Sequence, residues 1–326
     1  MNAKSNLLLF HPVTISEPQM NTSTYAIRNT VNATLKASSK ISLAATLLLA
    51  GLSAVNAAPL QVSHFNPGEN SIFAVSSSFI SGEHEMMLVD AQFQNNDAQT
   101  LVDTIKASGK KLTQVYISHS DPDFYFGLAV IKKNFPDAQI VATQTTVDAI
   151  KASMEGKLAY WGPILKDNAP SELVLPKAIH SDTFTIDGEQ VIIKGFNDKH
   201  PKHTFLWVPS AKTITGGVEV FDNTHVWMAD TQTASERQEW LTHLDAMEKL
   251  LPTTVIPGHY LGEARFNTHA IGFTREYVKA FEIAAKASKD SAELIQKMLA
   301  LYPQMPADAG LEISAKVYMG EMTWPM

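Results

Sequence analysis

A run of side chains able to bind metal follows a predicted strand near residue 117. Val115 to Ile117 is β-branched and aromatic, as expected of a buried strand, and His119-Ser-Asp-Pro-Asp123 comes directly after it. Imidazole and carboxylate groups bind divalent metals and transfer protons. In α/β folds, groups at the carboxyl ends of strands commonly form the active site. This stretch is therefore the first candidate for a metal or catalytic site.

Two other predicted strands carry histidine at an end. Asp198-Lys-His-Pro-Lys-His203 precedes a predicted strand at 204–208, and His259 follows another at 254–256 in Pro257-Gly-His259. A single histidine is more often a surface or core residue than a ligand. Three such clusters in one layered fold are expected to converge, because the ends of adjacent strands meet at one edge of a sheet.

The elements around these clusters predict two halves of strands and helices. The strongest local signals are an Asp187-Gly188 hairpin turn and a Thr233-Ala-Ser-Glu236 capping box. The predicted strands are 71–77, 85–89, 115–117, 139–142, 183–186, 190–194, 204–208, 213–215 and 254–256. The predicted helices start near 97, 127 and 143 in the first half, and at 233, 272 and 291 in the second, with Tyr160 and Trp161 in a loop. Two mixed sheets packed face to face with helices outside, an αββα sandwich, fit this order.

The first 57 residues are expected to lie outside that domain. Lys36 and Lys40 precede an apolar run at 41–52, which is too short to span a bilayer, and Val55-Asn-Ala57 offers the small residues that signal peptidase reads. This order predicts a signal peptide with an upstream extension and an exported, periplasmic or secreted protein. Either Met1 or Met20 serves as the start. Residues 58–326 are predicted to form a single domain.

Composition narrows the classes of partner. The chain has 326 residues, is 45% hydrophobic and contains no cysteine, so thiolate ligands and disulfides are excluded. Residues 58–326 hold 22 basic and 32 acidic residues, a net charge of −10, which argues against nucleic-acid binding. No segment after residue 57 is apolar enough to anchor in a membrane after signal cleavage. A small-molecule substrate is the expected partner, and the oligomeric state stays open.

The order of these motifs resembles the metallo-β-lactamase superfamily. The similar segments are Leu88-Val-Asp90, Ser118 to Gly127, His200, Gly216-Gly217 and Pro257-Gly-His259, over most of the chain after residue 70. The pattern of that superfamily is H-x-H-x-D-H, then a histidine, a Gly-Asp and a late Gly-His. The resemblance implies the αββα fold and a metal-dependent hydrolase with one or two ions, usually zinc.

The resemblance implies a first metal site with three protein ligands. His119 stands at the first histidine of the pattern, Asp121 replaces the second, and His200 matches the middle one, with His203 as its rival. Two histidines and one carboxylate bind zinc in hydrolases and iron(II) in non-haem sites.

The second metal site implied by the resemblance lacks two of its protein ligands. Asp123 and His259 remain, but Phe124 replaces a histidine and Gly217 the bridging aspartate. Glu219 and His225, near that gap, are alternative ligands or surface groups. One zinc ion is therefore expected, with iron as the alternative, and none if the site is degenerate.

The implied reaction is hydrolysis of an ester, lactone, amide or related bond. Asp123 would orient the attacking water or relay its proton, and His259 would hold substrate or protonate the leaving group. Tyr125 is a candidate oxyanion donor, or else a packing residue. Two other hypotheses stay open: a binding protein that has lost its metals, and an iron-dependent oxidative enzyme.

Overall fold

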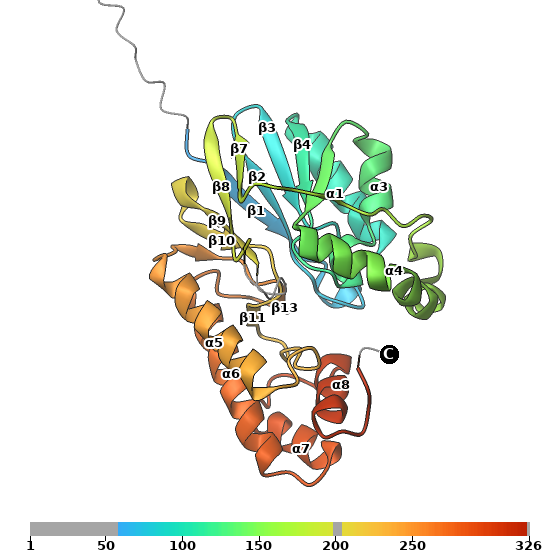
Figure 1. The fold of residues 1–326 in the computed structure, drawn as a ribbon, viewed down its shortest axis with the longest axis vertical. Coiled ribbons are helices and arrows are strands. Elements are labelled where there is room, and N and C mark those ends of the chain that lie inside the picture. The colour runs from blue at the N-terminus through green and yellow to red at the C-terminus, as the bar shows by residue number, and fades with distance from the viewer. Residues whose placement is uncertain (1–57, 198–203, 325–326) are drawn as a thin grey trace, which may run out of the picture. The chain divides into compact units, whose positions relative to one another are not determined.

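The computed structural model describes residues 58–197 and 204–324. These residues form two larger β-sheets and a small two-stranded sheet, with helices packed against the larger ones (Figure 1). The predicted α/β fold is confirmed. No helix among the described residues is long and apolar enough to cross a membrane.

The first sheet has six strands in the order β1-β2-β3-β4-β5-β6. Strands β1 to β3 pair antiparallel, and β3 to β6 pair parallel. The strands are β1 Gln61–Phe65, β2 Ser77–Ser81, β3 Glu85–Val89, β4 Lys111–Tyr116, β5 Gln139–Ala142 and β6 Lys177–Ala178. The helices that connect them are α1 Asn95–Ser108, α2 Pro122–Tyr125, α3 Leu128–Asn134 and α4 Gln144–Leu165.

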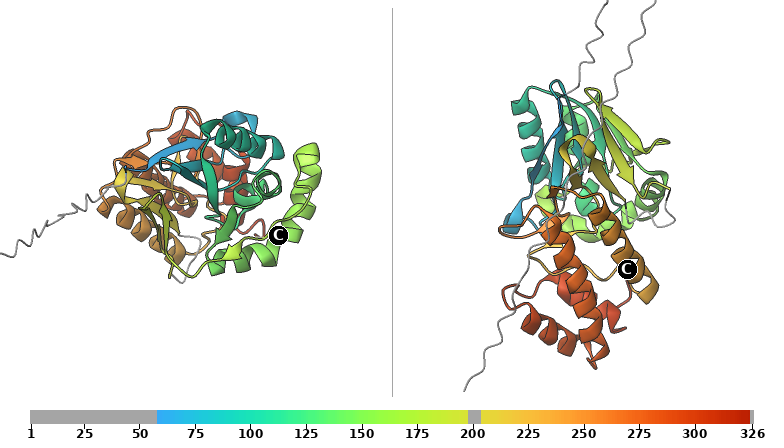
Figure 2. Two further views of the ribbon diagram at one scale, coloured as in Figure 1. Left: turned by 90° about the horizontal axis from the view of Figure 1, so that it is seen from above. Right: turned by 90° about the vertical axis from the view of Figure 1, so that its left-hand side faces the viewer.

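The second sheet has the order β12-β10-β9-β8-β7, antiparallel except for the parallel pair of β10 and β12. Strands β11 and β13 form a separate parallel pair. The strands are β7 Thr183–Ile186, β8 Glu189–Lys194, β9 Phe205–Val208, β10 Thr213–Thr215, β11 Phe221–Asp222, β12 Thr254–Val255 and β13 His259–Tyr260. The later helices, α5 Ala234–Lys249, α6 Thr268–Lys286, α7 Ser291–Leu301 and α8 Ala309–Tyr318, follow in the chain and lie together in Figure 2.

Alternation along the strands creates the layers. On β3, Leu88 packs into the cluster that holds α1 and α3, whereas Met87 and Val89 face the opposite cluster. That second cluster also contains Val191 and Leu206 from the other sheet, so it is the core between the sheets. A third cluster joins the second sheet to α5, α6, α7 and α8. The layers run helix, sheet, sheet, helix, as an αββα sandwich requires.

Several local predictions are confirmed. The turn at Asp187-Gly188 joins β7 and β8, and both residues have positive φ, as a type I′ turn needs. The Thr233 hydroxyl oxygen accepts the Glu236 N–H at the start of α5, and the Glu236 carboxylate accepts the Thr233 N–H. These two hydrogen bonds form the capping box. The buried residues of α5 include Trp240, Leu244 and Met247, at the spacing expected for one helical face.

Other local predictions were wrong. The strand expected at 71–77 starts only at Ser77, and β1 and α8 were not predicted. The loop expected around Tyr160 and Trp161 is part of α4, which continues past the predicted end at 154 to Leu165. The helix contains Gly156, Gly162 and Pro163. The helix persists because its far end is anchored, with Leu165 buried in the first core.

Candidate active site

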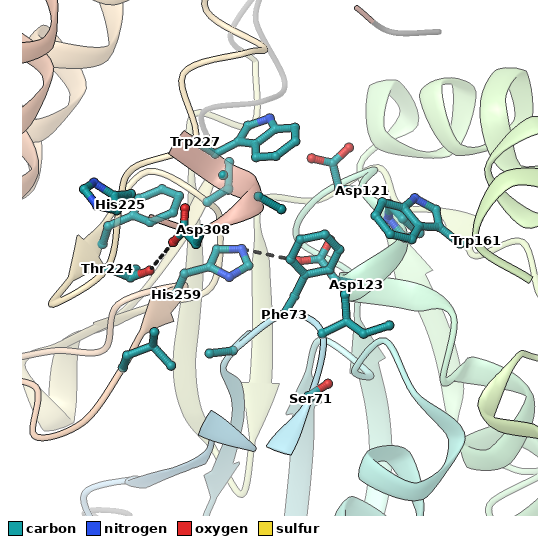
Figure 3. A pocket seen from close by; sticks show the side chains of 18 of the residues that line it. Ser71, Phe73, Asp121, Asp123, Trp161, Thr224, His225, Trp227, His259 and Asp308 are labelled. Atoms are coloured by element: carbon teal, nitrogen blue, oxygen red, sulfur yellow. Dashed lines mark hydrogen bonds and ion pairs between the residues drawn. The ribbon is translucent and has the colours of Figure 1, made fainter. Parts of the chain in front are cut away.

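The predicted site residues come from two segments that the fold brings together. His119 and Asp121 lie in the loop after β4, and Asp123 lies in the first turn of α2. His259 starts β13, which pairs with β11 through Phe221, and it also forms a β-bridge with Val75. Figure 3 shows the side chains of Asp123 and His259 pointing toward one another in the wall of a cavity. Convergence of the first and last motifs is therefore observed.

Asp123 and His259 form a buried acid–base pair. His259 Nε2 lies 3.3 Å from Asp123 Oδ2. Burial raises the pKa of Asp123 well above its usual range, and Asp121 adds to that effect. Burial lowers the pKa of His259 to about 4. Both shifts disfavour the charged form of each group, so the two side chains are poised to exchange a proton with each other or with a bound molecule.

Asp121 is held by a cation that the sequence analysis did not identify. The Lys157 ammonium, from α4, lies 3.1 Å from Asp121 Oδ1 and donates to the Ser120 carbonyl oxygen at 2.8 Å. On its other side, Asp121 Oδ2 is 3.4 Å from His119 Nδ1. The Asp121 N–H donates to that same ring nitrogen, so Nε2 is the atom of His119 that can bind a metal.

Phe124 stands where the resemblance expects a histidine ligand of the second metal. Its ring centroid is 5.3 Å from that of His119 and 5.7 Å from that of His259. The side chain is 1% exposed, so carbon atoms stand where that ion would need a ligand. Gly217 has φ +80°, and a Cβ there would lie 2.3 Å from the Thr204 carbonyl oxygen. The observed backbone therefore does not accept the aspartate that would bridge two ions.

The remaining candidates are placed as follows. His200 and His203 lie outside the described residues. Tyr125 is 1% exposed and packs against Phe126 rather than lining the cavity, which argues against an oxyanion role. Glu219 is buried 3.1 Å from His243 Nδ1, away from the cavity. The two ring nitrogens of His225 contact Tyr277 Oη and the Met305 carbonyl oxygen. Neither Glu219 nor His225 replaces the bridging ligand in this arrangement.

The described residues alone do not form a metal site. Within 58–197 and 204–324, no group of three or more His, Cys, Asp or Glu side chains is arranged to hold a metal. His119 and Asp121 supply two donors of suitable chemistry, and a third from His200 or His203 would complete a first site. The described residues thus fit one ion with such a third ligand, and they do not fit two.

Asp90 fixes the loop that carries His119. Its Oδ1 accepts the Ser118 N–H at 2.8 Å and its Oδ2 accepts the Ser118 hydroxyl at 2.6 Å. The Ser118 hydroxyl oxygen in turn accepts the Gly217 N–H at 2.8 Å, and the Ser118 carbonyl oxygen accepts the Thr204 hydroxyl at 3.2 Å. Asp90 itself has φ +64°, in the left-handed region. Ser118 therefore joins the loops of both sheets beside the site.

Replacement of Asp90 by asparagine is expected to change how stability depends on pH. Burial raises the pKa of Asp90 from 3.8 to about 7, so the folded wild type keeps a proton that the unfolded chain loses. The stabilisation from that proton is complete below pH 4 and is lost as the pH rises to about 7. The Asp90→Asn variant should gain stability relative to wild type over this range, by up to about 4 kcal/mol.

Urea unfolding at pH 4.5, 6 and 7.5 measures this difference. His259 contributes the opposite slope, since its lowered pKa makes stability fall as the pH drops from about 6.5 to 4. That contribution is common to both proteins and cancels in their difference. Asparagine also tolerates a positive φ, so the substitution should not change the backbone conformation at residue 90. A difference that stays constant with pH would contradict the buried carboxyl interpretation.

The site opens into a cavity of about 290 Å³. Asp121, Asp123 and His259 form part of its wall (Figure 3). The rest is mostly apolar or aromatic and includes Phe73, Tyr160, Trp161, Phe221, Trp227 and Trp324. Lys157, Asp308 and Trp324 were not singled out from the sequence. Each lies on or beside a helix where it matches no motif, and only the tertiary fold brings it to the cavity.

Comparison with known proteins gives structural matches only. No family model and no curated protein matches the sequence. A metallo-β-lactamase family protein from Thermus thermophilus superposes with a TM-score of 0.57 at 13% identity, over 79% of this chain and 91% of that one. A metallo-β-lactamase from Pontibacter korlensis matches at 15% identity over 68% of this chain and 94% of its own, with a TM-score of 0.46. On the first of these matches, together with the four layers described above, the chain has the metallo-β-lactamase fold.

Proposed function

We propose that this chain is an exported hydrolase that acts on a small, partly apolar substrate with at most one metal ion. The observation that carries the proposal is the convergence of Asp121, Asp123 and His259 on one cavity in this fold, with His119 buried 3.4 Å from Asp121. Export rests on the signal-peptide pattern within residues 1–57, which lie outside the described residues.

The metal would be held by His119 Nε2, Asp121 and His200, with His203 as the rival for the third position. Zinc suits this ligand set, with iron(II) as the alternative. A bound zinc ion supplies a water whose pKa is lowered to about 7. The Lys157 ammonium lies 3.1 Å from Asp121 Oδ1, so Lys157 competes with the metal for the negative charge of this carboxylate.

The chain's own residues account for the proton transfers. Asp123 Oδ2 and His259 Nε2 lie 3.3 Å apart, and both residues line the cavity. The pair can accept a proton from the attacking water and return one to the leaving group of an ester, lactone or amide. Phe221 stacks on the His259 ring with centroids 5.2 Å apart, which fixes the orientation of the imidazole.

A metal-free binding protein is the second candidate. The ammonium of Lys157 already neutralises Asp121, and the Phe124 ring separates the two histidines. Such a site has a stable arrangement of its described residues without any ion. The cavity would then retain a ligand rather than cleave it.

Metal content separates the two candidates. The wild-type protein, purified without an affinity tag, should retain about one equivalent of zinc and gain stability on adding zinc, by about 2.7 kcal/mol at a free concentration 100 times Kd. The Asp121→Ala variant should lose both properties. Lys157→Met should bind zinc more tightly than wild type, because the competing ammonium is gone.

Asp137→Ala is the matched control, since it removes an exposed aspartate far from the cavity lining. It should behave as wild type. Wild-type protein with less than about a tenth of an equivalent of any transition metal, and no stabilisation by zinc, would favour the binding protein instead. A panel of ester, lactone, amide and sulfate substrates then tests hydrolysis directly.

A further inference from the structure

One wall of the cavity is built from two tryptophans that a single carboxylate holds in place. The Trp227 and Trp324 rings lie 5.3 Å apart between centroids, at 70° to one another. The Trp227 indole N–H donates to Asp230 Oδ2 and the Trp324 indole N–H to Asp230 Oδ1, each at 2.8 Å. Both N–H groups are therefore used outside the cavity. What the pair offers a ligand is aromatic carbon surface.

The wall of the cavity holds more acidic than basic side chains among the described residues. Among the described residues that line it, Lys157 is the only lysine or arginine, and Asp121 neutralises it at 3.1 Å. Asp123, 3.3 Å from His259 Nε2, is a second acidic residue on this wall. Glu69, at the exposed rim, and Asp308 remain. The described wall thus carries excess negative charge beside a large aromatic surface.

Asp308 lines the same cavity as Trp227, Trp324 and His259, and Figure 3 shows its carboxyl group beside Thr224. Its Oδ1 accepts the Leu311 N–H at 2.8 Å, which caps α8, and its Oδ2 accepts the Thr224 hydroxyl at 3.4 Å. Both partners are neutral. Burial raises the pKa of this carboxyl, and its hydrogen bonds and the nearby His225 offset that rise only in part.

We propose that Trp227, Trp324 and Asp308 form a subsite for an organic ammonium group, so that the ligand of this cavity is an alkylated-ammonium compound such as a choline-type ester. Aromatic faces attract such cations through the ring quadrupole, and a buried carboxylate adds direct attraction. The scissile bond would then face Asp123 and His259 on the same cavity wall. This substrate class rests on the proposed hydrolase function, whereas the ammonium subsite itself does not.

Binding of choline to the purified protein without added metal tests the subsite directly. The trimethylammonium signal in ligand-observed NMR should shift upfield on binding, because the ring currents of the two indoles act on it. The neutral isostere 3,3-dimethylbutan-1-ol should bind about tenfold more weakly, and 3,3-dimethylbutanoate more weakly still.

Two variants identify the groups responsible. Asp308→Asn keeps the cap of α8, since asparagine caps helices as well as aspartate, but should weaken choline about tenfold and leave the neutral alcohol unchanged. Asp290→Asn is the matched control: Asp290 caps α7 through a 2.8 Å bond from Glu293 N–H and does not line the cavity. Trp227→Leu should weaken choline more than the alcohol.

Equal binding of choline and the alcohol, tighter binding of the carboxylate, or an Asp308→Asn variant that binds choline as wild type would each overturn the subsite. Failure of the proposed function has a different signature. If choline binds as described but no choline ester is cleaved with or without zinc, the subsite stands and the hydrolase does not. If esters without an ammonium group are cleaved and choline does not bind, the hydrolase function stands and the ammonium subsite does not.

Discussion

Replacement of Gly217 by aspartate is expected to destabilise the protein by roughly 2–5 kcal/mol and to add no second metal ion. The residue has φ +80°, and the new Cβ would lie 2.3 Å from the Thr204 carbonyl oxygen, so the backbone of one loop must move. The loop at Gly217 also donates its N–H to Ser118, beside His119, and that bond would be strained. Thermal unfolding followed by circular dichroism measures the loss, and elemental analysis counts the metal.

Gly262 offers a matched control for that substitution. It also has positive φ, at +62°, but a Cβ there has no neighbour within 4 Å. Gly262→Asp should therefore cost no more than about 1 kcal/mol, since aspartate tolerates the left-handed region in open space. Equal stability of the two variants would show that contact with the Thr204 carbonyl oxygen is not the cause of the destabilisation. A second equivalent of zinc in Gly217→Asp would show that Phe124 does not block the second ion.

Replacement of Asp123 by asparagine should lower kcat by about 10²- to 10⁴-fold for whichever ester or lactone the panel identifies. The amide has the size of the carboxyl group but cannot take up or release a proton beside His259 Nε2, 3.3 Å away. KM should change little, because the shape of the cavity wall is kept. Steady-state kinetics at neutral pH give both constants.

The double variant Asp123→Asn with His259→Asn shows whether the two residues act together. Groups that handle the same proton are not additive, so the double variant should be no slower than the slower single variant. Asp137→Asn, at an exposed position, should keep full activity. Losses that multiply in the double variant would mean that the two side chains act in separate steps. Activity within about threefold of wild type in Asp123→Asn would remove this pair from the mechanism.

The parts of the fold that the sequence predicted correctly are those with local causes. The turn at Asp187-Gly188 needs only two residues with positive φ, and the cap of α5 needs only Thr233 and Glu236. Convergence of His119 and His259 was also predictable, since both follow strands of a layered fold. For the turn and the cap, a short segment contains the whole reason for the structure.

The parts that could not be predicted depend on contacts between distant segments. Lys157 matches no motif, and its role appears only because α4 continues past Gly156 and brings the ammonium to Asp121. Trp324 reaches Asp230 from 94 residues along the chain. Tyr125 was a candidate oxyanion donor or a packing residue, and its position in α2 turns it into the first core. Such placements follow from packing, which residue type and spacing do not encode.

The hydrogen bonds of Ser118 have a consequence for how this site can evolve. Asp90 and Ser118 belong to the half of the chain that forms the first sheet, whereas Thr204 and Gly217 flank strands of the second, so the spacing of the two sheets sets the position of the His119 loop. A change in the intersheet core, at Val89 or Leu206 for example, would therefore alter reactivity without touching a ligand. Apart from Lys157, which contacts Asp121, the cavity residues of α4 and of the start of α8 do not belong to this hydrogen-bond set. New substrate specificities are therefore expected to arise from substitutions on that helical side of the cavity. The hydrogen bonds between the two sheets at Ser118 restrict which substitutions the loop of His119 accepts.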